Sequence, residues 1–156
     1  EWNAKNVYRG AVTREEAKQR IFAWLYNPES TDYLSSRAYR RDDALAMYWD
    51  GEKIKTPFNR EIQADRHHAL NYLVQSTASD LFLRKAVESS RILEGRKTQV
   101  AFLLHDALVL DFSTEDMDIL RQIIKVFPQT NLGSFRTNVS AGPDLGNMME
   151  LTWKQS

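Results

Sequence analysis

Residues 99–112, QVAFLLHDALVLDF, constrain the fold more strongly than any other part of the sequence. Two mainly apolar runs, each about as long as a strand, flank the polar dipeptide His105-Asp106. Apolar runs of this length that are rich in residues suited to a pleated backbone are typical of β-strands. The pattern therefore predicts a β-hairpin whose strands meet at a polar apex.

Asp106 brings a carboxylate into this apolar segment, where burying a charge without a partner is costly. In one interpretation, Asp106 accepts hydrogen bonds from backbone N–H groups of the turn. In the other, the hairpin presents the carboxylate to a hard cation such as Mg²⁺, which prefers oxygen ligands. The segment by itself is compatible with both.

The composition is that of an ordinary globular protein, and it narrows the possible partners. The chain has 156 residues, 42% hydrophobic and 27% charged, which is sufficient for about one domain. Its net charge of zero argues against binding to nucleic acid through bulk charge alone. The sequence has no cysteine and so no thiolate metal site. No apolar run reaches the ~18 residues that would cross a membrane, so we expect no membrane partner.

Residues 13–26 are predicted to form a helix. Thr13 can cap its start with Glu16 at the capping-box spacing, and the Asn27-Pro28 dipeptide ends it. One apolar stripe of this helix is expected to face the core, and it consists of Ala17, Ile21, Trp24 and Leu25.

A second line on the same helix has four-residue steps, so its members share one face. They are Arg14, Lys18, Phe22 and Tyr26. In one interpretation the two cationic side chains extend over two core aromatic rings. In the other, the cationic end binds phosphates and the aromatic end contacts a sugar or a base.

The other elements predict an α+β fold in which helices pack on a small antiparallel sheet. Helices are expected over residues 37–49, 61–93 and 113–127, the second of them with at most one break, and further strands over residues 53–58 and 135–141. Residues 148–153 form a short terminal segment of uncertain type.

Two groups of polar residues have both an ordinary and a functional interpretation. The first is a local basic patch of Arg37, Arg40 and Arg41, which is either a solvated surface or a phosphate contact. The second is a line of His67, Asn71 and Gln75 at four-residue steps. These side chains either lie on an exposed helix face or hydrogen-bond to bases and sugars.

Three separated stretches resemble motifs of the family A DNA polymerases, the class that includes bacterial DNA polymerase I and many phage replicative enzymes. Residues 14–26, R-x3-K-x3-F-x3-Y, are similar to the fingers helix of that family. Residues 71–80, N-x3-Q-S-T-A-S-D, are similar to the palm motif N-x3-Q-G-T-A-A-D, and residues 56–60, T-P-F-N-R, to the preceding T-x-x-G-R. Residues 104–107, L-H-D-A, are similar to the catalytic V-H-D-E turn. The motifs occur in the order of the family.

The resemblance implies roles for the residues of the helix at 13–26 in binding the incoming deoxynucleoside triphosphate (dNTP). Arg14 and Lys18 would hold the triphosphate, and Lys18 would act as general acid towards the pyrophosphate leaving group. Phe22 would pack on the sugar, and Tyr26 would lie beside the templating base. The arrangement suits phosphoryl transfer, which depends on positioning and charge neutralisation.

The resemblance also implies contacts with metal and DNA. Asp106 would be one of the two aspartates that bind a catalytic pair of Mg²⁺ ions, which clamp the attacking and leaving oxygens. Asn71, Gln75 and His105 would contact the primer–template near its newest base pair.

The sequence departs from the family pattern at several positions, which are Asn27, Asn59, His67, Ser76 and Ala107. The second metal-binding aspartate of the family lies before the fingers helix, and residues 1–12 contain nothing similar. We therefore expect a C-terminal fragment of a phage-like or plasmid-like polymerase, with fingers over residues 1–55 and palm over residues 56–156. Its second carboxylate would lie outside this chain, on the missing N-terminal part, and the isolated chain would be inactive. The parent enzyme would act in the cytoplasm of a bacterial or phage-infected cell.

Two alternatives stay open. One is a non-catalytic split subunit or nucleic-acid-binding module that needs an N-terminal partner, and such a chain would expose an apolar face. The other is a fragment of a single-subunit RNA polymerase, which shares the palm and the His-Asp turn. The residues at 71, 75 and 22 favour DNA synthesis, and a preference for ribonucleotides would contradict it.

Overall fold

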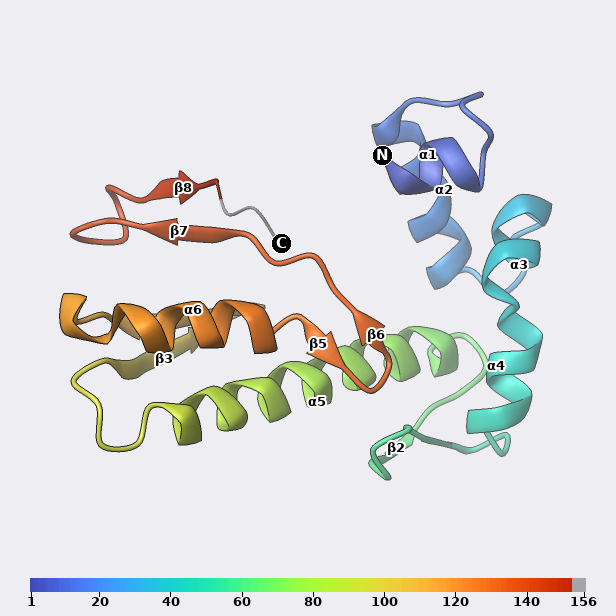
Figure 1. The fold of residues 1–156 in the computed structure, drawn as a ribbon. Coiled ribbons are helices and arrows are strands. Elements are labelled where there is room, and N and C mark those ends of the chain that lie inside the picture. The colour runs from blue at the N-terminus through green and yellow to red at the C-terminus, as the bar shows by residue number, and fades with distance from the viewer. Residues whose placement is uncertain (153–156) are drawn as a thin grey trace. The chain divides into compact units, whose positions relative to one another are not determined.

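The computed structural model describes residues 1–152 and shows two compact units, Glu1–Asp80 and Leu81–Ser156. The predicted α+β class is confirmed, because the described residues form six α-helices and four antiparallel sheets of two strands each (Figure 1). The assignment of residues 1–55 to fingers and residues 56–156 to a palm concerns function and stays a prediction. Among residues 1–152, no helix is both long and apolar enough to cross a membrane.

The first unit contains four helices, a β-hairpin and the start of a long helix. These are α1 (Trp2–Asn6), α2 (Arg14–Tyr26), α3 (Tyr33–Tyr39), α4 (Arg41–Tyr48), β1 (Lys53–Lys55), β2 (Glu61–Gln63) and α5 (Ala69–Ile92), which continues into the second unit. The predicted cap of α2 is confirmed: Glu16 N–H donates to Thr13 Oγ1 at 3.3 Å, and Thr13 N–H donates to Glu16 Oε2 at 2.8 Å.

Two apolar clusters hold the first unit together. One joins the N-terminal segment to α2 through the buried residues Val7, Tyr8 and Ala17. The other contains Ile54, Ala64, Ala69 and Leu73, with side chains of α4 packed against them. The second cluster fixes the β1–β2 hairpin against the first turns of α5 and against α4.

Two helix predictions for this unit are wrong in extent. The helix expected over residues 37–49 is broken at Arg40, whose φ of 48° is left-handed and cannot continue a right-handed helix. The helix expected from residue 61 begins at Ala69, because Glu61–Gln63 pairs with β1 as a strand. Asp65 then initiates the turn before α5 by accepting a hydrogen bond from His68 N–H at 2.9 Å.

The second unit is built around the predicted hairpin. Its elements are the rest of α5, β3 (Gln99–Leu104), β4 (Ala107–Asp111), the 3-10 turn Thr114–Asp116, α6 (Met117–Val126), β5 (Gln129–Thr130), β6 (Gly133–Ser134), β7 (Val139–Ala141) and β8 (Met149–Leu151). Helix α6 runs beside the hairpin (Figure 1), and its buried Ile119 and Ile123 pack with Leu93, Val100 and Leu110. The helix expected over residues 113–127 is thus confirmed for Met117–Val126, and its apolar side faces the core.

Two strand predictions for this unit differ from the structure in detail. The strand expected over residues 135–141 comprises only Val139–Ala141, the residues that pair with β8. The register of β3 with β4 shifts between Val100 and Phe102, so Ala101 is the extra residue of a β-bulge. The segment expected at residues 148–153 is a strand over Met149–Leu151, and residue 153 lies outside the described residues.

A buried carboxylate connects the start of the hairpin with the start of α6. Thr98 N–H donates to Asp116 Oδ2 at 2.7 Å, and Ser113 N–H donates to Thr98 Oγ1 at 3.0 Å. The hydrogen bond from Thr98 and the nearby Arg96 guanidinium hold the pKa of the Asp116 carboxyl below its ordinary value.

The lowered pKa of Asp116 predicts how its contribution to stability depends on pH. The unfolded chain binds the proton more tightly than the folded chain, so the contribution is complete above the unfolded pKa of about 3.9. It is lost as the pH falls towards the lower folded pKa. We expect an Asp116→Asn chain to unfold several degrees earlier than wild type at about pH 7, with the gap in Tm shrinking below about pH 4. Thermal unfolding followed by circular dichroism between these pH values measures the gap, and a gap that is the same at both would contradict the prediction.

Candidate functional site

The helix α2 presents its cation–aromatic line on an exposed face. Phe22 is 45% and Tyr26 is 53% exposed, and Arg14 and Lys18 are exposed as well. The interpretation in which these cations cover core aromatic rings is therefore wrong. The opposite stripe supplies the packing instead, with Ala17 and Trp24 buried as predicted.

Three side chains of this line, Lys18, Phe22 and Tyr26, follow one another closely on the helix surface. The Lys18 Nζ lies 5.8 Å from the centre of the Phe22 ring, within the range of a cation–π contact. The Phe22 and Tyr26 rings follow, with centroids 6.3 Å apart. The Arg14 guanidinium lies 3.4 Å from Glu15, but both side chains are mostly exposed, so solvent weakens the pair.

The structure brings together two motifs that are far apart in the sequence. The Gln75 Nε2 on α5 donates a hydrogen bond of 3.3 Å to the Tyr26 hydroxyl at the end of α2. Both side chains are exposed, so a ligand that reaches one of them can also reach the other.

Asn71 lies one turn before Gln75 on α5 but differs from it in environment. It is only 7% exposed, and within residues 1–152 its Oδ1 has no hydrogen-bond partner. The interpretation of residues 67, 71 and 75 as an ordinary exposed helix face is therefore wrong for Asn71. His67 lies before α5 rather than on it. The predicted DNA contacts of Asn71 and Gln75 stay predictions.

An ion pair joins the two halves of the palm-like motif in the first unit. The Arg60 guanidinium lies 2.5 Å from the Asp80 carboxylate, and the Asp80 side chain is only 12% exposed. Arg60 ends the segment T-P-F-N-R and Asp80 ends N-x3-Q-S-T-A-S-D. The pair therefore fixes the loop between β1 and β2 to the helix that carries Asn71 and Gln75.

In the second unit, His105 and Asp106 form the apex of the β3–β4 hairpin. Leu104 pairs with Ala107, and His105 takes a left-handed φ of 53° that closes the tight turn. Asp106 is exposed. Within residues 1–152, no hydrogen bond or ion pair reaches its carboxylate. The interpretation in which Asp106 bonds to the backbone of the turn is thus wrong, and its oxygens face solvent.

An exposed carboxylate of this kind fits part of a magnesium site. Mg²⁺ is typically bound by one or two carboxylates together with substrate phosphates and water. Asp106 can supply one such oxygen ligand. Among residues 1–152 there is no group of three or more His, Asp or Glu side chains that could hold a metal by itself.

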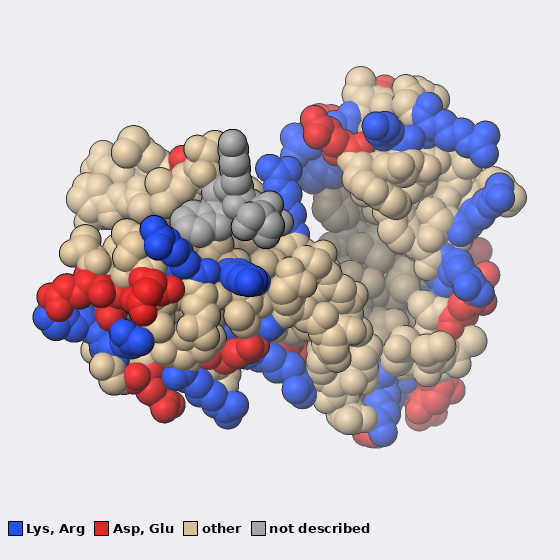
Figure 2. All heavy atoms as spheres, in the orientation of Figure 1, with Lys and Arg blue, Asp and Glu red and all other residues tan. Residues whose placement is uncertain are grey.

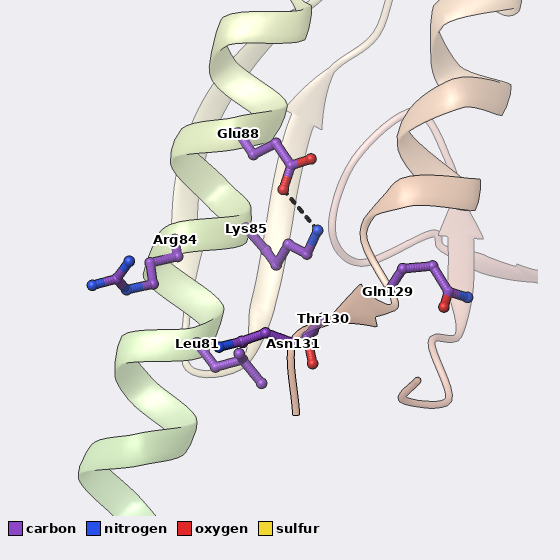
Figure 3. Close-up of a pocket in the computed structure, with 7 residues that line it drawn as sticks. All are labelled: Leu81, Arg84, Lys85, Glu88, Gln129, Thr130 and Asn131. Atoms are coloured by element: carbon purple, nitrogen blue, oxygen red, sulfur yellow. Dashed lines mark hydrogen bonds and ion pairs between the residues drawn. The ribbon is translucent and has the colours of Figure 1, made fainter. Parts of the chain in front are cut away.

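A pocket of about 350 Å³ lies in the second unit between α5 and the segment that contains β5 (Figure 3). Its residues are Leu81, Arg84, Lys85, Glu88, Gln129, Thr130 and Asn131. The Lys85 ammonium lies 2.7 Å from Glu88, and the Thr130 hydroxyl donates to Gly133 O at 2.7 Å. Figure 3 shows the Arg84 side chain pointing away from the segment that contains β5. Since the polar side chains of Lys85, Glu88 and Thr130 already have partners within the chain, the pocket indicates no particular ligand.

Charged side chains of both signs are mixed on the visible surface (Figure 2). This distribution agrees with the net charge of zero.

Sequence analysis missed two buried charged residues. The sequence groups Arg41 with Arg37 and Arg40 in a basic patch, but Arg41 is 9% exposed and packs inside the first unit. Asp116 had no predicted role, yet it connects two segments of the second unit. Helical spacing gives no signal for either, because their partners are backbone groups 13 to 18 residues away.

No protein-family model matches the chain, and no curated protein and no solved structure matches it. The resemblance to polymerases therefore depends on the motifs themselves and on the contacts between them.

Proposed function

We propose that this chain forms the fingers and palm part of a family A DNA-directed DNA polymerase, which adds deoxynucleotides to the 3′ end of a primer. The observation that carries the proposal is the hydrogen bond between Tyr26 and Gln75. The resemblance assigns both residues to the neighbourhood of the newest base pair, and it does so from separate motifs. Their contact is what such a shared position requires.

The exposed line on α2 supports the part of the proposal that concerns the incoming nucleotide. Arg14 and Lys18 would bind the triphosphate near the start of the helix, where the helix dipole also favours negative charge. The Lys18 ammonium would give a proton to the pyrophosphate oxygen as it leaves. Phe22 would pack against the sugar, and Tyr26 would face the templating base. Asp106 would hold Mg²⁺, which neutralises the phosphates and supports the attacking and leaving oxygens.

The alternative of a split subunit is favoured by a different observation. The β3–β4 sheet has only two strands, and Phe102 and Leu104 at its tip are 43% and 47% exposed. Phe102 pairs with Val109, and Leu104 pairs with Ala107. These side chains form an apolar face of the hairpin, opposite the face that packs on α6. Such a face and the free strand edges suit a polypeptide that docks and supplies the second carboxylate.

Binding of a labelled primer–template tests the nucleotide face directly. We expect the correct dNTP, added with Mg²⁺, to strengthen binding of the chain in a fluorescence anisotropy titration. In a chain with both Arg14→Ala and Lys18→Ala, the factor by which dNTP strengthens DNA binding should fall about tenfold or more. Each charged hydrogen bond contributes about 1.5–3 kcal/mol.

Arg121→Ala is the matched control, since it removes an exposed cation from α6. Equal stimulation by dNTP in all three chains would contradict the proposal. Stronger stimulation by ribonucleotides than by deoxynucleotides would favour the RNA polymerase alternative. Binding of DNA with no response to dNTP would favour a nucleic-acid-binding module.

A further inference from the structure

Arg41 is a buried charged residue that the proposed mechanism does not use. It is the first residue of α4 and is 9% exposed. Burial lowers the pKa of its guanidinium, because a charge is costly to remove from water. A cation held in this way needs partners that compensate for its lost hydration.

The partners of Arg41 lie at the end of α2. Its guanidinium donates one hydrogen bond to the Trp24 carbonyl and another, of 2.6 Å, to the Pro28 carbonyl. It also lies over the Trp24 ring, 4.4 Å from the ring centre. Because a helix C-terminus carries partial negative charge, a cation at this position is favourable. The planar fork of arginine allows it to reach two carbonyls and stack on a ring at once.

The fold directs Arg41 to this position through the break between α3 and α4. The left-handed φ of Arg40 ends α3 and starts α4 in a new direction. Trp24 is held from α3, where the Ser36 hydroxyl accepts a hydrogen bond of 2.8 Å from the Trp24 Nε1. The Trp24 ring is therefore fixed on one edge and covered by Arg41.

Tyr26 lies between the two carbonyls that Arg41 binds. Its backbone is held on both sides by Arg41, and its hydroxyl is restrained by Gln75. Its ring is otherwise exposed. The backbone fixes the Cα–Cβ vector from which a ring extends and limits the rotamers open to it, so contacts on both sides of Tyr26 restrict the directions that its ring can take.

We propose that Arg41 is the positioning residue of Tyr26 and thereby a determinant of base selection. The second half of this inference rests on the proposed function, in which Tyr26 faces the templating base. The first half concerns the fold alone and can be tested without any activity.

The first test follows the position of Tyr26 by ¹⁹F NMR with 3-fluorotyrosine at that residue in the whole chain. We expect Arg41→Lys to shift or broaden the resonance by more than its linewidth, because an ammonium cannot bridge two carbonyls. Arg121→Lys, the same change on α6, should leave it unchanged. An unchanged resonance in Arg41→Lys would overturn the proposal. So would loss of the helical circular dichroism signal in both Arg41→Lys and Arg41→Gln, which would make Arg41 a general structural residue.

The second test measures base selection in primer extension, with the upstream polypeptide added. We expect Arg41→Lys to reduce the ratio of kcat/KM for correct over incorrect dNTP by about tenfold, since small misplacements are costly in a positioned site. A purely structural role would lower activity for both nucleotides equally, so an unchanged ratio would overturn the role in base selection. If wild type extends no primer while the ¹⁹F resonance still moves, the proposed function fails and the positioning of Tyr26 stands.

Discussion

An Asp106→Asn substitution is expected to lower the rate of primer extension by roughly a thousandfold or more. Mg²⁺ contributes several kcal/mol to phosphoryl transfer, and each 1.4 kcal/mol corresponds to a factor of about ten. Asparagine has nearly the same shape as aspartate but lacks the charge, so it binds the ion poorly. The measurement is extension of a labelled primer with dNTPs and Mg²⁺, using this chain alone and together with the N-terminal part of a family A polymerase that carries the second carboxylate.

Asp111→Asn provides a matched control. Asp111 is an exposed carboxylate on the same hairpin, opposite Gln99 and away from the apex. Its variant should extend primers as wild type does. Full activity in Asp106→Asn would show that Asp106 is not a ligand of the proposed metal site. Extension by the wild-type chain alone that is lost in Asp106→Asn would show that the second carboxylate lies within residues 1–156, contrary to our expectation.

Replacing Ile54 by alanine is expected to destabilise the first unit by about 2–5 kcal/mol, a large part of the 5–15 kcal/mol typical of a domain. Ile54 is completely buried and lies at the centre of the cluster that joins the β1–β2 hairpin to α4 and α5. Its truncation removes apolar contacts and leaves a cavity in packed surroundings. Urea unfolding followed by tryptophan fluorescence is suitable, because Trp24 and Trp49 both belong to this unit.

Val74→Ala is the control for Ile54→Ala. Val74 is 47% exposed on α5, so its truncation should change stability by less than about 0.5 kcal/mol. Circular dichroism recorded in the same titration also reports the helix α6. If Ile54→Ala were as mild as Val74→Ala, packing around Ile54 would not stabilise the first unit as expected.

Those elements of the fold that depend on local signals could be predicted from the sequence. The start of α2 follows from the capping residues Thr13 and Glu16, and the hairpin follows from two apolar runs around a polar dipeptide. The break at Arg40 could not be predicted, because arginine has no preference for a left-handed backbone. The sequence assigns Glu61–Gln63 to a helix, because a strand of three residues is too short to show the two-residue alternation of a β-strand.

The candidate site was predictable only within single elements. Four-residue spacing was sufficient to place Arg14, Lys18, Phe22 and Tyr26 on one face, although it could not show that the face is exposed. The contact of Tyr26 with Gln75 joins residues 49 positions apart, and no local pattern encodes it. Burial of Asn71 likewise depends on the packing around it rather than on its helix alone.

The pairing of every described strand with its neighbour along the sequence has a consequence for how the protein is made. β1 pairs with β2, β3 with β4, β5 with β6 and β7 with β8. Closing such short loops costs little entropy, and hairpins form within microseconds. Ribosomes add only about 5–20 residues per second. Each hairpin can therefore form during synthesis, as soon as its second strand has left the ribosome, without waiting for the C-terminus.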